Sequence, residues 1–326
     1  MKTLDLIIIG GGPTGLNCAI EAKKAGLSYI ILEKGLLVNS IYHFPINMTF
    51  FSTSKLLEIG DTPFISHTEK PTRREALEYY RRLQQAYDLK VNLYEPVKKM
   101  ERRADGLYFV TTSKGEYLGA SVIVATGFYD TPRLLNIPGE DLPKVKHYYD
   151  DAHPYIGQKV LVIGAANSAC DVALETWSKG SEVTMAIRED DIYQGVKYWI
   201  RPNIENRIKE GSITAYFNTV VKEIREHEVV LEGPDGTLFT IENDFVLAMT
   251  GYKPNYELLH NLGLEIPDDE DQIPVHDPET LETSLPNVYI AGVVCAGMKT
   301  SKLFIENTRD HGEIIVNQIV GRLVSG

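Results

Sequence analysis

Hydrophobic residues follow one another almost without interruption at positions 4–9, and this pattern predicts a parallel strand that is buried on both faces. Directly after it, small residues recur at helical spacing over positions 15–22, which predicts a helix that lies close to a sheet. Gly26 closes this helix, and positions 28–32 form a second apolar run. The amino-terminal segment is therefore expected to be a β-α-β unit.

The turn between the first strand and its helix carries the pattern G-x-G-x-x-G at Gly10, Gly12 and Gly15. The first glycine permits a tight turn, the second lets a pyrophosphate approach the backbone, and the third lets helix and strand pack closely. Pro13 stands where the helix begins, so its missing N–H costs nothing. Glu33 follows Gly10 by 23 residues, the separation expected for a carboxylate that binds a ribose diol. The alternative is a purely structural glycine turn.

A carboxylate at this position suits a ribose with a free 2′-hydroxyl, so the first unit is expected to bind the adenosine diphosphate part of FAD. The N–H groups at the start of the helix would hold its phosphates. Two later strand ends are expected to contact the same ligand. They are the Ala-Thr-Gly sequence at 125–127 and the glycine after the last strand. The predicted FAD-binding residues are Gly10, Gly12, Pro13, Thr14, Gly15, Glu33, Lys34, Thr126, Gly127 and Gly292.

A second unit of the same layout begins with an apolar run at 159–163, followed by Gly164 and a helical pattern. The next predicted strand covers positions 182–187. Ala166 and Ala169 stand where the first unit has its second and third glycines. The methyl group of Ala166 is expected to push a bound pyrophosphate slightly outward.

Arg188 follows Gly164 by 24 residues, at the position where the first unit has its acid. A guanidinium suits a 2′-phosphate, so the second unit is expected to bind NADPH rather than NADH. Arg201 is a further candidate for the phosphate. The alternative is that Arg188 is a solvated strand end, which the acidic residues at 189–191 favour. The predicted NADPH-binding residues are Gly164, Ala166, Asn167, Ser168, Ala169, Arg188 and Lys197.

Segments 122–127 and 245–251 are both apolar runs that end in Thr-Gly, and we interpret them as the two crossings between domains. A last strand within 287–297 is expected to lead to a final helix at about 301–319. We therefore expect an α/β protein with two Rossmann-like three-layer dinucleotide-binding domains. The FAD-binding domain is discontinuous, with residues 1–127 and 252–326, and the NADPH-binding domain comprises residues 128–251.

The charge balance narrows the range of partners. The 326 residues include 33 basic and 45 acidic ones, for a net charge of −12, so nucleic acid and anionic membranes are not expected partners. No apolar run is long enough for a membrane span.

Three cysteines without CxxC spacing argue against a disulfide framework and favour a cytoplasmic setting. The eight histidines show no metal-ligand spacing, so no metal is expected.

The layout resembles the thioredoxin-reductase-like flavoproteins, and within them it is most similar to the bacillithiol disulfide reductase family. The resemblance covers nearly the whole chain and implies one FAD, NADPH as the reductant, and a low-molecular-weight disulfide, bacillithiol disulfide, as the substrate. It leaves open whether the protein is a homo-oligomer. The segments that carry it include "NSIYHFP" at 39–45, "MTFFSTSKLLEIGDTPF" at 48–64, "KPTRREALEYYRR" at 70–82, "VKYWIRPNIENRIKEGSI" at 196–213 and "LFIEN" at 303–307.

The cysteines do not supply an obvious relay for disulfide chemistry. Many members of the resembled family carry a cysteine after "GGGP", where this chain has Thr14, so a mechanism through that thiol is excluded. Cys18 and Cys170 fall on helices and are expected to be packing residues. Cys295 follows the last strand, where a helix N-terminus would lower its pKa. It is the one cysteine considered for a redox role, although buried turn cysteines are usually inert, and the catalytic residues stay unassigned.

Other functions fit the same architecture. An NADPH–ferredoxin or NADPH–flavodoxin reductase would need to dock an acidic partner, which the net charge of −12 disfavours. A sensor would bind both nucleotides without turnover. The sequence also lacks the F-x-G-x-x-x-H-x-x-x-W motif that is characteristic of flavin monooxygenases. Two groups are interpreted as solvated surface: the Tyr-Tyr-Arg-Arg run at 79–82, and His311 with Glu306 and Arg309 on the final helix.

Overall fold

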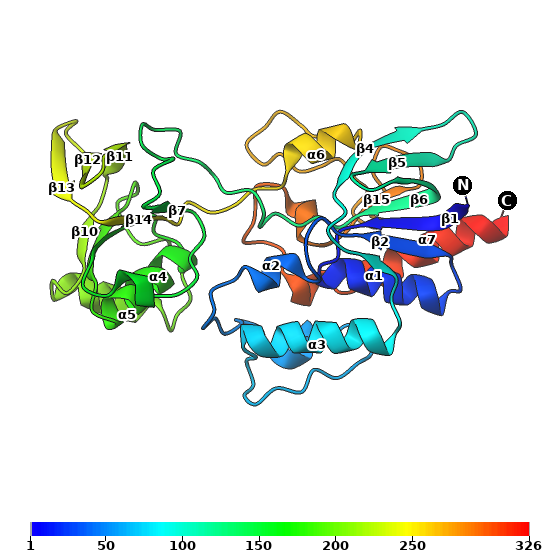
Figure 1. Ribbon diagram of the computed structural model, residues 1–326, viewed down its shortest axis with the longest axis horizontal. Coiled ribbons are helices and arrows are strands. Elements are labelled where there is room, and N and C mark those ends of the chain that lie inside the picture. The colour runs from blue at the N-terminus through cyan, green and yellow to red at the C-terminus, as the bar shows by residue number, and fades with distance from the viewer. Residues whose placement is uncertain (1, 326) are drawn as a thin grey trace. The chain divides into compact units, whose positions relative to one another are not determined.

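The computed structural model describes residues 2–325 and divides into two compact units (Figure 1). The first unit is formed by the chain up to His43, by Asn47–Thr131 and by the chain from Tyr252 onward. The second unit consists of Pro132–Gly251 together with the short segment Phe44–Ile46. No helix among the described residues is long and apolar enough to cross a membrane.

The first unit is built on a seven-stranded sheet that is parallel on one side and antiparallel on the other. The parallel strands lie in the order β3-β2-β1-β6-β15, and β5 and β4 continue the sheet from β6 as antiparallel strands. Their bounds are β1 Thr3–Ile9, β2 Tyr29–Leu32, β3 Val91–Asn92, β4 Val97–Arg102, β5 Tyr108–Thr112, β6 Glu116–Val124 and β15 Val288–Ile290.

Strand β6 changes partner along its length. Its first half pairs with β5, with Gly119 opposite Tyr108, and its second half pairs with β15, with Val122 opposite Val288. The apolar run predicted at 4–9 is β1, and its isoleucines are almost fully buried. The buried core of this sheet combines residues of β1, β6 and β15, so the last strand completes the core that the first strand begins.

Helix α1 (Pro13–Lys24) packs against the final helix, α7 (His311–Ser325). The two helices approach closely, because a Cβ atom added at Gly312 would lie 3.0 Å from the backbone nitrogen of Cys18. The side chain of Asn17 also donates a hydrogen bond to the carbonyl of Arg309. The remaining helices of this unit are α2 Asn39–Tyr42, α3 Arg73–Ala86, α6 Tyr256–Asn261 and the 3₁₀ helices η1 Ser54–Leu57, η3 Gly292–Ala296 and η4 Ile305–Asn307.

The final helix does not begin near residue 301, as the sequence pattern predicts, but at His311. The ten residues before it form turns and the short helix η4. The hydroxyl of Thr308 donates to the carbonyl of Phe304 at 2.8 Å, and the side chain of Asn307 accepts from the N–H of Phe304 at 2.7 Å. Such side-chain bonds compete with the helical backbone pattern and delay the helix.

Helix α3 contains the Tyr-Tyr-Arg-Arg run at 79–82, and only part of this run is the solvated surface that the sequence predicts. Thr72 and Glu75 form a capping box at its start. Tyr79 and Tyr80 are buried rather than solvated, and their hydroxyl groups donate to the carbonyls of Thr62 and Leu57. Only the arginines of the run at 79–82 lie on the surface, where both pair with one glutamate of the same helix.

The second unit has a five-stranded parallel sheet in the order β10-β9-β8-β14-β7. Its strands are β7 Val145–Lys146, β8 Lys159–Ile163, β9 Glu182–Ala186, β10 Thr214–Tyr216 and β14 Phe245–Ala248. Its helices are η2 His153–Tyr155, α4 Asn167–Ser178 and α5 Arg201–Lys209. The predicted strands at 159–163 and 182–187, and the helical pattern between them, match β8, β9 and α4 to within a few residues.

A three-stranded antiparallel sheet lies beside this parallel sheet and was not expected from the sequence. It consists of β11 Val220–Ile224, β12 Glu228–Glu232 and β13 Leu238–Glu242. Alternating apolar residues of these strands join the core of the parallel sheet. The Pro-Asp-Gly sequence at 234–236, a common turn signal, connects the last two strands and could have indicated this hairpin.

Candidate dinucleotide sites

The glycine turn after β1 is shaped by contacts within the protein at two of its three glycines. Gly10 has a φ of +112°, and a Cβ atom added to it would lie 2.4 Å from the carbonyl oxygen of Ala125. A Cβ atom at Gly15 would lie 2.0 Å from the carbonyl oxygen of Gly10. Both positions therefore require glycine for the turn itself. Because β1 and β6 are neighbours, Gly10 and Ala125 leave the sheet at the same edge.

Gly12 is different, because no contact within residues 2–325 requires it to be a glycine. Its backbone is extended, with φ −77° and ψ 179°, and a Cβ atom added there would meet nothing within 4 Å. No side chain caps the helix end that begins here. The open space thus lies beside free N–H groups and the positive end of the helix dipole, which is what a pyrophosphate needs. The turn therefore fits the phosphates of FAD.

Glu33 is buried at the end of β2 and is tied to the same turn. One carboxylate oxygen accepts from the N–H of Gly11 at 2.6 Å, and the other accepts from the N–H of Gly35 at 2.8 Å. Burial raises the pKa of Glu33, and these two N–H donors oppose the rise. Lys34, the next residue, is exposed and pairs with Asp130 at 2.9 Å. Glu33 is thus held in one orientation beside the glycine turn, as a ribose-binding carboxylate should be.

The strand ends that follow β6 and β15 bring further predicted residues to this edge. The hydroxyl oxygen of Thr126 is buried and has no hydrogen-bond partner within residues 2–325, so it is available to a ligand. Gly127 has a φ of +67°. Gly292 has a φ of +83°, and a Cβ atom there would lie 2.9 Å from the hydroxyl oxygen of Thr14. The orphaned hydroxyl of Thr126 fits a cofactor that passes close to this edge, whereas Gly292 is required to be a glycine by its own backbone conformation and by Thr14.

His311 holds the Gly292 turn and is not a surface charge. The backbone N–H of Gly292 donates to His311 Nδ1 at 3.1 Å. Burial lowers the pKa of His311 to about 4, so the ring is neutral at pH 7 and carries its proton on Nε2. Glu306 and Arg309 lie before α7, in η4 and the following turn, rather than on the helix. Local sequence patterns reveal neither this role of His311 nor the contact of Thr308, whose hydroxyl lies 3.4 Å from that of Thr14.

The three cysteines are buried and unreactive by their surroundings. Cys295 lies inside η3 rather than at the N-terminus of a helix, and burial raises its pKa to about 12 instead of lowering it. Burial likewise raises the pKa of Cys18 and of Cys170 to about 12. The thiol of Cys170 lies 3.6 Å from the carbonyl oxygen of Ala165. The expectation that a helix end activates Cys295 is therefore wrong.

The second turn follows the backbone path of the first with alanines in two places. Gly164 has a φ of +123°, and a Cβ atom there would lie 2.7 Å from the carbonyl oxygen of Met249, after the neighbouring strand β14. Ala166 has φ −88° and ψ −177°, close to the values of Gly12. Ala169 is buried, whereas Ala166 and Ser168 are exposed at the start of α4. The turn thus presents an uncapped helix end to a ligand.

Asn167 uses its side chain to hold a neighbouring loop. Its Nδ2 atom donates to the carbonyl of Gly195 at 3.3 Å, and its Oδ1 atom accepts from the N–H of Lys197 at 3.0 Å. The N–H of Tyr193 also donates to the carbonyl of Ala165 at 3.1 Å. The loop at 193–197 is therefore fixed along the second turn, and Lys197 is brought to it. Sequence spacing alone does not reveal this bridge.

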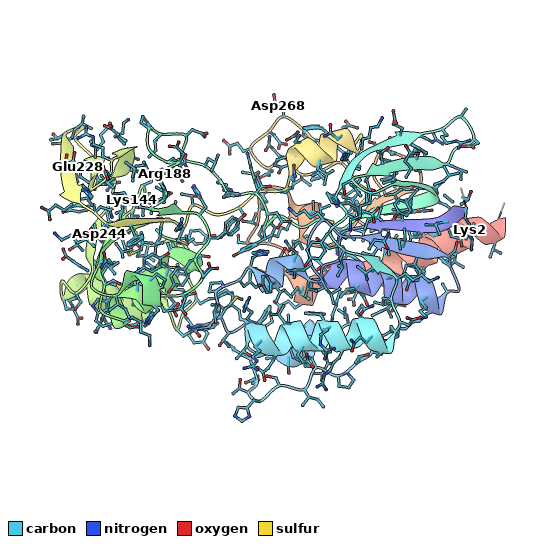
Figure 2. All side chains as sticks on the ribbon, viewed as in Figure 1. Lys2, Lys144, Arg188, Glu228, Asp244 and Asp268 are labelled. Carbon is cyan, nitrogen blue, oxygen red and sulfur yellow. The ribbon has the colours of Figure 1, made fainter. Side chains whose placement is uncertain are left out.

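Arg188 stands at the exposed end of β9, among the side chains of the second unit (Figure 2). Its guanidinium pairs with Glu189 at 2.7 Å. Arg201, at the start of α5, pairs with Asp191 at 2.7 Å and with Glu205 at 2.5 Å. The structure therefore brings each arginine together with acidic neighbours, and their place at the carboxyl end of the sheet matches that of the second turn.

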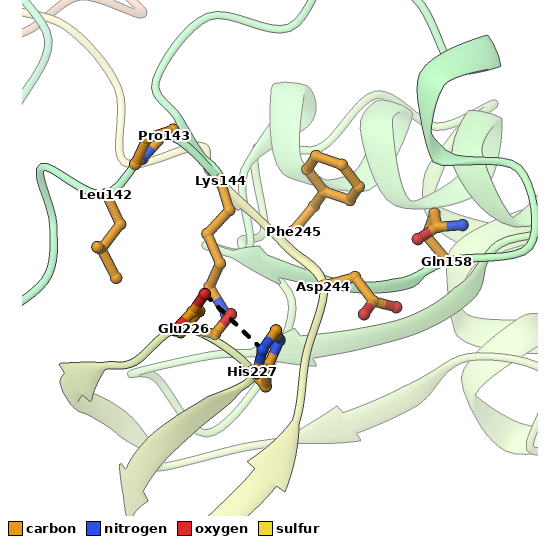
Figure 3. A pocket seen from close by; sticks show the side chains of 8 residues that line it. All are labelled: Leu142, Pro143, Lys144, Gln158, Glu226, His227, Asp244 and Phe245. Carbon is orange, nitrogen blue, oxygen red and sulfur yellow. Dashed lines mark hydrogen bonds and ion pairs between the residues drawn. The ribbon is translucent and has the colours of Figure 1, made fainter.

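An open depression of about 370 Å³ in the second unit is unrelated to this turn (Figure 3). Its lining residues precede β7, β8 and β14, begin β14, or join β11 to β12, so it lies at the amino ends of the parallel strands. Lys144 crosses it and donates to the carbonyls of Glu226 and Asn243, both at 3.1 Å. Within the described chain, no three histidine, cysteine, aspartate or glutamate residues gather as a metal site.

Comparison with known proteins shows the family to which the chain is similar. A model of the family "Pyridine nucleotide-disulphide oxidoreductase" matches residues 7–292. Bacilliredoxin reductase Bdr of Bacillus subtilis (strain 168) is 44% identical over 316 residues, which cover 97% of each chain. The structure of bacillithiol disulfide reductase Bdr (YpdA) from Staphylococcus aureus superimposes with a TM-score of 0.95 at 43% identity, over 99% of each chain.

A more distant relative is named for a different electron acceptor. The ferredoxin–NADP reductase of Ignicoccus hospitalis is 26% identical over 90% of this chain and 91% of its own. The match at 44% identity places the chain with the Bdr reductases rather than with this relative. The chain therefore belongs to the pyridine nucleotide-disulphide oxidoreductase family, groups there with the Bdr reductases, and is a reductase whose cofactors are FAD and NADPH.

Proposed function

We propose that this reductase passes electrons from NADPH through FAD to a low-molecular-weight disulfide, bacillithiol disulfide. The observation that supports this substrate is the similarity, over nearly the whole chain, to the structure named as a bacillithiol disulfide reductase. The three free cysteines fit a reducing compartment, and we place the reaction in the cytoplasm. The overall change is RSSR + NADPH + H⁺ → 2 RSH + NADP⁺.

We assign the cofactors to the two glycine turns. In the first unit, Gly12 leaves room for the pyrophosphate of FAD, Glu33 binds the ribose, and the hydroxyl of Thr126 supplies a further hydrogen bond. In the second unit, the turn at 164–169 binds the pyrophosphate of NADPH, and Arg188, with Lys197 and Arg201, binds its 2′-phosphate. The remaining predicted residues are assigned to the same two ligands: Gly10, Pro13, Thr14 and Gly15 of the first turn and Lys34, Gly127 and Gly292 of the neighbouring strand ends to FAD, and Asn167 and Ser168 to NADPH.

FAD, when bound, supplies the two-electron redox centre between NADPH and the disulfide. The protein contributes binding and orientation. The fixed carboxylate of Glu33 sets the position of the adenosine part, because it cannot move without breaking its hydrogen bonds to the N–H groups of Gly11 and Gly35. The neutral imidazole of His311 keeps the Gly292 turn in place. No cysteine of the described chain offers an exposed thiolate, so the disulfide is reduced without a protein thiol relay.

Reduction of a ferredoxin or flavodoxin is the second candidate, because the Ignicoccus hospitalis relative is a ferredoxin–NADP reductase. The deciding experiment reduces the flavoprotein anaerobically with NADPH and then adds bacillithiol disulfide, glutathione disulfide, coenzyme A disulfide, ferredoxin or flavodoxin. We expect flavin absorbance to return only with a disulfide, fastest with bacillithiol disulfide. Reoxidation by ferredoxin alone would overturn the proposal, and reoxidation by no acceptor would favour a sensor.

The assignment of the NADPH site has its own test. Arg188→Ala should raise the Michaelis constant for NADPH far more than that for NADH, because only NADPH carries the 2′-phosphate. Lys209→Ala is a suitable control, since Lys209 is an exposed cation at the far end of α5. Equal changes for both nucleotides would remove the phosphate-binding role from Arg188.

A further inference from the structure

The arginines assigned to the 2′-phosphate form ion pairs with carboxylates of the protein. Arg188 donates to Oε1 of Glu189 through Nε at 3.1 Å and through Nη2 at 2.7 Å. The side chains of this pair are 80% and 51% exposed, so solvent and ligands reach both. Arg201 donates to Asp191 through Nη2 at 2.7 Å and to Glu205 through Nε at 2.5 Å. Glu189 and Asp191 both come from the loop that follows β9.

A carboxylate and a phosphate compete for the same face of an arginine. A guanidinium binds either anion through two parallel N–H groups, and Glu189 occupies the Nε–Nη2 edge of Arg188. A 2′-phosphate that takes this edge must displace the carboxylate. If it takes the other edge instead, it meets an arginine that already bears a carboxylate, and it lies close to this second anion.

We propose that Glu189 and Asp191 are specificity-determining residues, which act as internal competitors of the 2′-phosphate and limit the preference for NADPH over NADH. This inference rests on the 2′-phosphate site given under the proposed function. In the free enzyme the two carboxylates hold Arg188 and Arg201, and NADPH binding exchanges them for the phosphate. NADH carries no such group, so its binding leaves both ion pairs intact.

Asp190 provides a matched control between the two competitors. It is exposed on the same loop and makes no ion pair in the structure, which describes this whole loop. Asp190→Asn therefore removes one negative charge near the site without freeing an arginine. Any effect shared by Glu189→Gln and Asp190→Asn comes from the general charge of the loop, and any excess in Glu189→Gln comes from the released guanidinium.

The test titrates the oxidised holoenzyme with adenosine 2′,5′-bisphosphate and, separately, with 5′-AMP, and follows binding by calorimetry. We expect Glu189→Gln to tighten binding of the bisphosphate about two- to fivefold beyond the effect of Asp190→Asn, as the strength of an exposed ion pair implies. Asp191→Asn should act in the same direction, and the double variant should exceed either. Binding of 5′-AMP should not change.

The outcomes separate this inference from the site on which it rests. Equal affinities of Glu189→Gln and Asp190→Asn for the bisphosphate would overturn the competition while leaving the site intact, provided that Arg188→Ala weakens binding. Weaker binding in Glu189→Gln would also overturn it, because Glu189 would then orient the arginine for the phosphate. An Arg188→Ala variant that binds the bisphosphate like the wild type would refute the site assignment and the competition together.

Discussion

The backbone N–H of Gly292 donates a hydrogen bond to Nδ1 of His311 at 3.1 Å, and this bond joins the end of the last strand to the start of the last helix. It can form only while the imidazole is neutral, because a protonated ring has no acceptor left. Burial lowers the pKa of His311 to about 4, and His276 lowers it further, while Asp310 opposes the shift. The fold thus favours the neutral ring.

This relationship predicts a pH-dependent stability. Between about pH 6.5 and pH 4 the unfolded chain binds a proton at His311 that the folded chain does not, so the free energy of unfolding falls as the pH is lowered through this window. The effect approaches about 1.4 kcal/mol per pH unit. In His311→Asn, the amide oxygen can accept from Gly292 without titrating, so this part of the slope should disappear in urea unfolding measured from pH 7 to pH 4.5.

The control for this measurement is His227→Asn, since the ring of His227 is exposed in the second unit. It should lose stability with falling pH as the wild type does. If His311→Asn and the wild type gave parallel curves, the half-buried neutral histidine would not be a source of acid sensitivity.

A second prediction concerns Glu33. Both carboxylate oxygens accept backbone N–H groups, and glutamine has only one oxygen to offer, so Glu33→Gln should leave one of the two donors unsatisfied. A buried donor without a partner costs about 1–3 kcal/mol of unfolding free energy. The purified variant should also hold less FAD, measured as the ratio of flavin to protein absorbance. Glu116→Gln, an exposed change at the start of β6, should alter neither quantity, and normal FAD content in Glu33→Gln would contradict the ribose role.

The parts of the fold that could be predicted from the sequence are those fixed by local chemistry. Two glycines of the first turn are demanded by a positive φ at Gly10 and by the close approach of the backbone at Gly15, and strand β8 follows directly from its apolar run. These features depend on residues close together in the chain. The sequence therefore suffices for both β-α-β units and for the position of Glu33 beside the first turn.

What could not be predicted depends on partners that are distant in the sequence or on the competition between hydrogen bonds. The delayed start of α7 results from the bond of the Thr308 hydroxyl to Phe304. The neutral state of His311 requires burial that no local pattern reveals. Cys295 resembles a thiol at a helix end in sequence, but η3 buries it among apolar residues of the core.

The third prediction is that no native cysteine takes part in turnover. With a pKa of about 12, only about one thiol in ten thousand is ionised at pH 8, so iodoacetamide should modify Cys295 very slowly in the folded enzyme. Mass spectrometry should find all three cysteines modified only after unfolding. Cys295→Ala should keep disulfide reduction within about twofold of the wild type.

Thr14→Cys is the matched positive control for this labelling. It places a thiol in the first turn of α1, where the helix dipole lowers its pKa, at a partly exposed position. This thiol should react far faster than the native three. Rapid modification of Cys295 in the wild-type enzyme, with loss of turnover at the same rate, would show that a thiol relay operates after all.

The last prediction separates the glycines that shape the first turn from the glycine that receives the cofactor. Gly10→Ala should prevent correct folding, because the position has a φ of +112° and the new Cβ atom would lie 2.4 Å from the carbonyl of Ala125. Gly12→Ala should cost less than about 1 kcal/mol of unfolding free energy in the apoprotein, since its backbone is extended and the added methyl group meets no atom of the described residues. The same methyl group occupies the space left for the pyrophosphate. Gly12→Ala should therefore be purified folded but with at least about tenfold weaker FAD binding, a loss of about 1.4 kcal/mol.

Gly115→Ala, in the β5–β6 turn of the same unit, also adds a methyl group to open space and should bind FAD normally. Wild-type FAD affinity in Gly12→Ala would show that the pyrophosphate does not lie at the start of α1.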